Sequence, residues 1–191
     1  QAMLQKELEK CRAAAAGSNL VGLFHCQGEL SEKTALDLHA SGIPMLMEFA
    51  AMTDLDQARV DKGVAYVHGE IDKLQAKGRI NQDKANRFKA LVTGATDKAA
   101  FADADFVIEA VFEDLKVKQQ VFAECEAVVS DTCVLATNTS SLSVTDMAAD
   151  LKHPERVVGF HFFNPVAVMP LLESVRAEQT DDATLATAFA V

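Results

Sequence analysis

Two stretches of the chain combine a nearly continuous apolar run with a polar end. Residues 104–111 (ADFVIEAV) lead into the acids Glu113 and Asp114, after which the pattern changes to that of an amphipathic helix. Residues 134–143 (VLATNTSSLS) open into hydroxyls and an amide. Apolar runs of this length, each followed by a helix, are typical of strands in a parallel sheet. The pattern predicts an α/β fold, a parallel sheet flanked by helices, that binds ligands beyond the carboxyl ends of its strands.

Two helices of this fold can be located from their apolar and capping residues. From Leu115 onward, Val121, Phe122, Cys125 and Val129 recur at helical spacing and would cover the sheet with one stripe. Ser143, followed three positions later by Asp146, resembles a capping box and predicts that another helix begins there.

A histidine and a glutamate flank an apolar turn near the carboxyl end. His161 lies in the segment GFHFFNP, and Glu173 ends the segment VMPLLE. Histidine exchanges a proton near neutral pH, and a carboxylate that fixes its tautomer prepares it to act as a base. The two residues are therefore a candidate acid/base pair, although a histidine beside phenylalanines is more often a core residue. Ser140, at the polar end of residues 134–143, is expected to face a cleft.

Three long segments, in this order, resemble the NAD-binding domain of 3-hydroxyacyl-CoA dehydrogenase: DFVIEAVFEDLKVKQQVF, LATNTSSLSVTDMA and PERVVGFHFFNPVAVMPLLESV. The resemblance covers residues 54–191 and implies a Rossmann-like domain. It also implies NAD as cofactor and oxidation of (S)-3-hydroxyacyl-CoA to 3-oxoacyl-CoA, in fatty-acid β-oxidation or butanoyl-CoA metabolism. The stretches KLQAKGRINQDKANRF and RAEQTDDATLATAF are most similar to the dehydrogenase part of bacterial multifunctional β-oxidation proteins.

The resemblance implies roles for individual residues. His161 would remove the 3-hydroxyl proton while hydride leaves C3 for the nicotinamide, and Glu173 would orient and polarise it. Ser140 would contact both the substrate oxygen and the nicotinamide region. Further cofactor contacts are implied for Glu113, Lys118 and Asn164. Two of these have plainer interpretations, because Lys118 could be a solvated helix residue and Asn164 could form an Asn-Pro turn.

Asp54 follows the apolar run at residues 43–52, where the second strand of the family ends in an acid. By resemblance it would bind the hydroxyls of the adenosine ribose and favour NAD over NADP, since a 2′-phosphate would meet like charge. The alternative is that Thr53 and Asp54 cap a helix that begins near Leu55. Both interpretations can hold together.

Residues 1–53 depart from the family pattern. They predict a helix at 3–16, a strand at 20–24, a loop at 25–28, a helix at 31–40 and the apolar run at 43–52, but no G-x-G-x-x-G loop for a pyrophosphate. The phrase NLVGLFHCQGELSEKTAL is similar to a strand-loop-helix segment of flavodoxin-like proteins, without the threonine loop that would hold FMN. Two interpretations stay open for this segment, a fused or misjoined gene and a degenerate first unit of the same fold.

The chain also stops at Val191, where family members continue into an all-helical domain that binds the acyl chain and mediates dimerisation. We therefore expect part of an enzyme, with little or no dehydrogenase activity of its own. The parent enzyme would be a homo-oligomer or part of a multifunctional β-oxidation protein. The alternative is a non-catalytic Rossmann-like fragment that serves as an interaction or assembly module. Another nicotinamide-dependent hydroxyacid dehydrogenase is less favoured, because many of those use a lysine in place of His161 and Glu173.

Composition argues against several other classes of protein. A net charge of −10 disfavours nucleic acid and anionic membranes as partners. The apolar stretches fall below the roughly 18 residues that a membrane span requires, which predicts a cytoplasmic domain. Cys11, Cys26, Cys125 and Cys133 lack metal-ligand spacing and are expected to be reduced. His25 beside Cys26 has no third ligand, and the acids at 103–114 are spread along a strand, so no metal is expected.

Overall fold

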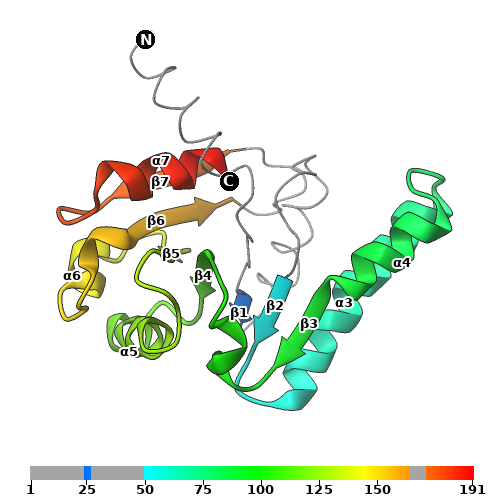
Figure 1. Cartoon of the computed structure of the whole chain (residues 1–191), viewed down its shortest axis with the longest axis horizontal. Helices are drawn as coiled ribbons and strands as arrows, with labels where there is room; N and C mark the ends of the chain where they lie inside the picture. The colour runs from blue at the N-terminus through cyan, green and yellow to red at the C-terminus, as the bar shows by residue number, and fades with distance from the viewer. Residues whose placement is uncertain (1–23, 27–49, 164–170) are drawn as a thin grey trace, which may run out of the picture.

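The computed structural model describes residues 24–26, 50–163 and 171–191. This part of the chain contains one sheet in which neighbouring strands are parallel, except that the last strand is antiparallel to its neighbour. The strands are β1 (Phe24–Cys26), β2 (Ala50–Thr53), β3 (Val92–Ala95), β4 (Phe106–Ala110), β5 (Val134–Thr137), β6 (Val157–Phe162) and β7 (Leu172–Arg176). Their order across the sheet is β3-β2-β1-β4-β5-β6-β7 (Figure 1).

The strand order shows where this fold can bind a ligand. The chain steps from β1 outward to β2 and β3, and then returns to β4 on the other side of β1. This is the order of a doubly wound sheet, which binds its ligands outside the carboxyl ends of the strands where the order reverses. The predicted Rossmann-like parallel sheet is confirmed.

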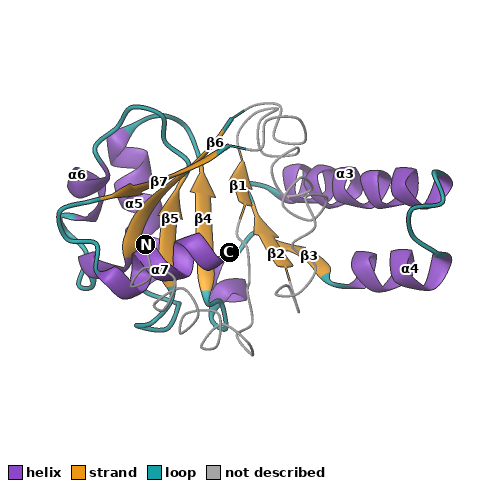
Figure 2. Ribbon diagram, turned by 90° about the horizontal axis from the view of Figure 1, so that it is seen from above, coloured by secondary structure: helices purple, strands orange, loops and turns teal. Residues whose placement is uncertain are grey.

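Helices cover both faces of the sheet. α5 and α6 lie on one face and α7 on the other, while α3 and α4 form a hairpin that extends beyond the β3 edge (Figures 1 and 2). The bounds are α3 (Gln57–Ala76), α4 (Gln82–Ala90), α5 (Leu115–Glu126), α6 (Val144–Ala148) and α7 (Asp182–Ala190), with 3₁₀ turns at Lys98–Phe101 and Pro154–Arg156. Among the described residues, no helix is both long and apolar enough to cross a membrane.

Alternate residues of β4 contribute to two separate hydrophobic clusters, one on each face of the sheet. Val107 belongs to the cluster that contains Phe122 of α5. Phe106 and Ile108 belong to the other cluster, where the ring centroids of Phe106 and Phe160 lie 5.3 Å apart. Side chains of a strand alternate between the two faces of a sheet. The two clusters therefore bury β4 on both faces.

The two predicted helices are confirmed. Val121, Phe122 and Cys125 form the buried stripe of α5, and Val129 is buried just beyond its end. The Ser143 side chain accepts a hydrogen bond from the Asp146 N–H at 3.1 Å and so caps α6. The predicted helices at 3–16 and 31–40 lie outside the described residues.

Two predictions about local structure are wrong. His25 and Cys26 lie in β1 rather than in a loop, because they continue the parallel pairing with Glu109 and Ala110 of β4. The helix after β2 begins at Gln57 instead of near Leu55. Its N-cap is Asp56, whose carboxylate accepts the Arg59 N–H at 2.9 Å, so Asp54 does not cap it.

Candidate functional site

Polar side chains gather at the carboxyl ends of the strands. Asp54 follows β2, Glu113 lies in the loop after β4, and the segment 138–141 follows β5. His161 lies near the end of β6. The parallel arrangement brings the ends of β2, β4, β5 and β6 to one edge, so residues far apart in sequence share one side of the sheet.

His161 and Glu173 lie directly opposite each other in the antiparallel pair of β6 and β7. The His161 Nδ1 atom is 2.9 Å from the Glu173 Oε2 atom. A carboxylate at Nδ1 favours the tautomer that carries its proton there, which leaves Nε2 as the proton acceptor. His161 is 18% exposed, and its ring lies 4.7 Å from the Phe163 ring. It is therefore not a buried core histidine, and the predicted pairing of His161 with Glu173 is confirmed.

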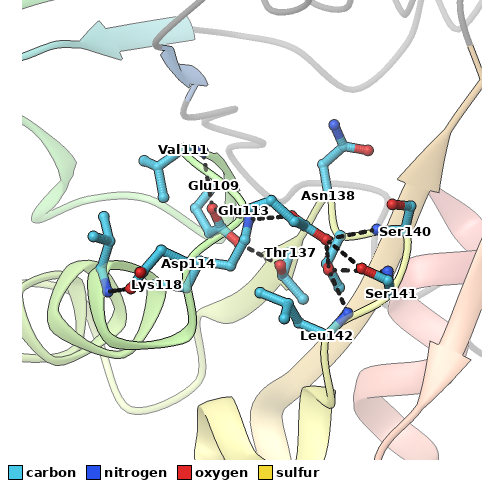
Figure 3. Close-up of polar contacts among 12 residues, drawn as sticks. Glu109, Val111, Glu113, Asp114, Lys118, Thr137, Asn138, Ser140, Ser141 and Leu142 are labelled. Carbon is cyan, nitrogen blue, oxygen red and sulfur yellow. Dashed lines mark hydrogen bonds and ion pairs between the residues drawn. The ribbon is translucent and has the colours of Figure 1, made fainter.

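Glu113 connects the end of β4 to the turn after β5 (Figure 3). Its Oε1 atom accepts the Thr139 hydroxyl at 2.5 Å, the Ser140 N–H at 3.2 Å and the Ser141 hydroxyl at 3.3 Å. Partial burial acts to raise the pKa of Glu113, but the Thr139 hydrogen bond, the Lys118 charge and the two serine donors outweigh it. The pKa of this carboxyl is therefore held below its ordinary value, and Glu113 carries a negative charge at neutral pH.

The Asn138 side chain fixes the start of the same turn against β6. Its Oδ1 atom accepts the Phe162 N–H at 3.0 Å, next in the chain to His161. Ser140 itself is exposed at this edge of the sheet. The turn that carries Ser140 is therefore held by Glu113 on one side and by the strand of His161 on the other.

Lys118 is fully buried, so the interpretation of this residue as a solvated helix side chain is wrong. Its Nζ atom lies 2.9 Å and 3.0 Å from the two carboxylate oxygens of Glu109, and 3.5 Å from Glu113 Oε2. Glu109 is equally buried. Glu109 is not among the site residues predicted from the sequence, although a charged residue within an apolar strand is a recognisable sign of a buried polar partner.

Asp54 follows β2, next to β1, and its side chain is 8% exposed. The Asp54 Oδ1 atom accepts the Leu55 N–H at 2.6 Å and lies 3.9 Å from Arg59 Nη1. Asn164, the remaining predicted cofactor contact, lies outside the described residues. Across 24–26, 50–163 and 171–191, no cluster of three metal-ligating side chains is present.

The side chains of two cysteines are described. Cys125 and Cys133 are free and buried, and burial raises the pKa of each thiol to about 12. They lie within the core cluster of α5 and β5 rather than at the carboxyl edge of the sheet.

The chain is similar to known proteins over most of its length. The family model described as "3-hydroxyacyl-CoA dehydrogenase, NAD binding domain" matches residues 32–191. This match begins before residue 54, and β1 and β2 lie in the same sheet as the other strands. The domain boundary after residue 53 stays a prediction.

Curated relatives include the fatty acid oxidation complex subunit alpha of Idiomarina loihiensis, which is 36% identical over 91% of this chain. The same subunit of Psychrobacter arcticus is 33% identical over 98% of this chain. The chain spans only 22% and 24% of the lengths of these two relatives.

Solved structures share the fold. The 3-hydroxybutyryl-CoA dehydrogenase of Escherichia coli is 30% identical, with a TM-score of 0.80 over 90% of this chain and 35% of that one. FadB2 of M. tuberculosis is 34% identical, with a TM-score of 0.77 over 89% of this chain and 58% of that one.

Proposed function

Because the chain belongs to the family of 3-hydroxyacyl-CoA dehydrogenase NAD-binding domains, we propose that it is the cofactor-binding part of an enzyme that oxidises (S)-3-hydroxyacyl-CoA to 3-oxoacyl-CoA with NAD. The observation that carries this proposal is the His161–Glu173 pair at the carboxyl edge of the sheet. The relatives named as fatty acid oxidation complex subunits and 3-hydroxybutyryl-CoA dehydrogenases support fatty-acid β-oxidation or butanoyl-CoA metabolism as the setting.

In the proposed reaction, NAD would supply the acceptor for the hydride that leaves C3 of the substrate. His161 takes the 3-hydroxyl proton at Nε2, the nitrogen that does not face Glu173. The imidazole then carries a positive charge, which the Glu173 carboxylate at 2.9 Å stabilises. Ser140, on the turn held against β6, would donate a hydrogen bond to the substrate oxygen. The protein thus contributes one proton acceptor and the positions of the reacting groups.

The described residues fit a dinucleotide at the reversal of strand order. Asp54, which does not cap α3, has the chemistry to bind ribose hydroxyls, and its charge would disfavour the 2′-phosphate of NADP. Glu113 and Ser140 lie across the edge, after β4 and β5, where they would meet the nicotinamide half of the cofactor. Lys118 is buried beneath this surface, where it contacts Glu113. Asn164 remains a proposed contact.

We propose in addition that the longer protein works within a fatty-acid oxidation complex or as a homo-oligomer in the cytoplasm. The names of the curated relatives support the first of these. The size of the native assembly, measured by light scattering on protein from its natural source, would separate a complex from a homo-oligomer.

The acid/base assignment can be tested by replacing His161 in the longer protein. His161→Gln should lower turnover of acetoacetyl-CoA with NADH by roughly 10² to 10⁴, with little change in NADH affinity, since the substitution removes the proton carrier alone. Glu173→Gln should show the same pattern more mildly.

His153→Gln is the matched control for this experiment. His153 is half-exposed and contacts Glu155 before β6 begins, at the opposite edge of the sheet, so its replacement should leave turnover unchanged. Full turnover in His161→Gln would remove the base assignment.

A further inference from the structure

Glu109 and Lys118 form an ion pair in which both side chains are 0% exposed. Lys118 Nζ donates to both carboxylate oxygens of Glu109, at 2.9 Å and 3.0 Å. Glu109 also accepts the Thr137 hydroxyl and, at 3.0 Å, the Val111 N–H. Taking two charges out of water is costly, and well-packed neutral side chains are often as stable as a buried pair. Stability alone therefore does not account for this pair.

The Lys118 ammonium connects the buried pair to a side chain at the carboxyl edge of the sheet. It lies 3.5 Å from Oε2 of Glu113, which is 39% exposed. The Lys118 charge helps to lower the pKa of Glu113, so Glu113 keeps its negative charge while the ammonium holds it. The other Glu113 oxygen, Oε1, accepts hydrogen bonds from Thr139, Ser140 and Ser141.

The turn at 139–141 is thereby connected to the strand that carries the proposed base. Asn138, which precedes this turn, accepts the Phe162 N–H at 3.0 Å. Contacts run without a break from Glu109 to Lys118, from Lys118 to Glu113, and from Glu113 to the turn beside β6. The close-up in Figure 3 shows Glu109, Glu113 and the serines of the turn as neighbours.

We propose that Glu109 is a positioning residue of the cofactor site, which holds Lys118 beneath Glu113 and so fixes the Glu113 carboxylate and the 139–141 turn where the nicotinamide half of NAD would lie. Glu109 touches neither cofactor nor substrate and acts through Lys118. It is anchored in a strand buried on both faces, and a support on a rigid element holds a site more accurately than a loop does. This inference rests on the proposed function and deepens it.

The double variant Glu109→Gln/Lys118→Met separates positioning from stability. It removes both charges at nearly constant volume. The amide oxygen of the new side chain can accept from the Val111 N–H, and its amide nitrogen can donate to the Thr137 hydroxyl oxygen. We expect its melting temperature to stay within about 5 °C of the parent, because a buried pair contributes little net stability. NADH affinity, measured by the fluorescence of NADH, should fall about tenfold or more, as for the loss of a charged hydrogen-bond partner.

A second measurement needs no cofactor. In the double variant, carboxyl NMR should show the pKa of Glu113 rising toward its ordinary value, because the Lys118 charge that helps to lower it is gone. The Ser140 amide signal should move as well, since its N–H donates to Glu113. A residue with a purely structural role would leave both signals of the folded variant as they are in the parent.

Glu126→Gln is the matched control. Glu126 is also a mostly buried acid, but it contacts Arg156 and the N–H groups of Lys152 and His153 away from the carboxyl edge. Its replacement should lower the melting temperature and leave NADH affinity and the Glu113 pKa unchanged.

Three results would overturn the proposal: parental NADH affinity in the double variant, an unchanged Glu113 pKa and Ser140 signal, or a double variant that does not fold. A different result would contradict the proposed function and leave the role of Glu109 to be decided separately. A parent chain that binds no NADH would contradict NAD binding, while the two NMR signals would still decide whether the Glu109–Lys118 pair positions Glu113.

Discussion

Gly159 lies in β6 beside the edge strand β7, where a side chain would have little room. It pairs directly with Val175, two positions before His161 in β6 and two positions after Glu173 in β7. A Cβ at residue 159 would lie 2.6 Å from Val175 Cβ, 3.2 Å from its Cγ2 and 3.3 Å from Val144 Cγ2. The first distance is far inside van der Waals contact, so Gly159→Ala must displace a neighbour.

The loss of stability in Gly159→Ala depends on which of the two strands can move. β6 is paired with β5 and buried, whereas β7 is at the edge and Val175 is 44% exposed. We therefore expect β7 to shift outward, with a loss of about 1–3 kcal/mol in the free energy of unfolding, typical of an overpacked contact. The same shift would carry Glu173 away from His161 and weaken the hydrogen bond that fixes the imidazole tautomer.

Urea denaturation at neutral pH measures this loss, with Gly69→Ala as control. Gly69 lies within α3 and a Cβ there would meet nothing within 4 Å, so this variant should gain up to about 1 kcal/mol from helix propensity. In a double-mutant cycle, Val175→Gly should relieve the clash and give a coupling energy of about 1 kcal/mol or more. A Gly159→Ala variant as stable as the parent, with no coupling to Val175→Gly, would refute the reasoning.

Three further predictions concern the rest of the molecule. Asp54→Ala should weaken NAD binding and relax discrimination against NADP, measured by parallel titrations; an unchanged preference would show that Asp54 does not select the cofactor. Partial burial acts to raise the pKa of Glu126, but hydrogen bonds from Lys152, His153 and Arg156 hold it below its ordinary value. This contribution to stability is present above about pH 4.5 and is lost as pH falls through the lowered pKa, so Glu126→Gln should be less stable than the parent at pH 7 and approach it in acid. Cys125 and Cys133, whose thiol pKa is raised to about 12 by burial, should react with a thiol reagent at pH 7.5 only as fast as the protein unfolds, in a variant whose other two cysteines are serine. Rapid labelling of either thiol in the folded protein would contradict its burial.

Much of the candidate site could be predicted because its residues lie in strongly patterned segments. His161 and Glu173 lie only 12 positions apart in the sequence, and the antiparallel pairing of β6 with β7 places them opposite each other. The position of Asp54 at the end of a strand is predictable from the sequence. That a residue other than Asp54 caps the following helix is not. Asp54 and Asp56 are both good N-cap residues, and only the observed start of α3 at Gln57 decides between them.

The sequence by itself determined the class of fold, the strands and helices around residues 104–148, and the His161–Glu173 pair, because apolar periodicity and capping residues act over a few positions. Tertiary structure decided the rest. Whether residues 24–26 form a strand depends on pairing with β4, and whether Lys118 is solvated or buried depends on Glu109, which lies on a different element. The burial and partners of a charged side chain depend on contacts between segments remote in sequence. For this reason the buried pair beneath Glu113 is visible only once the sheet and α5 are packed together.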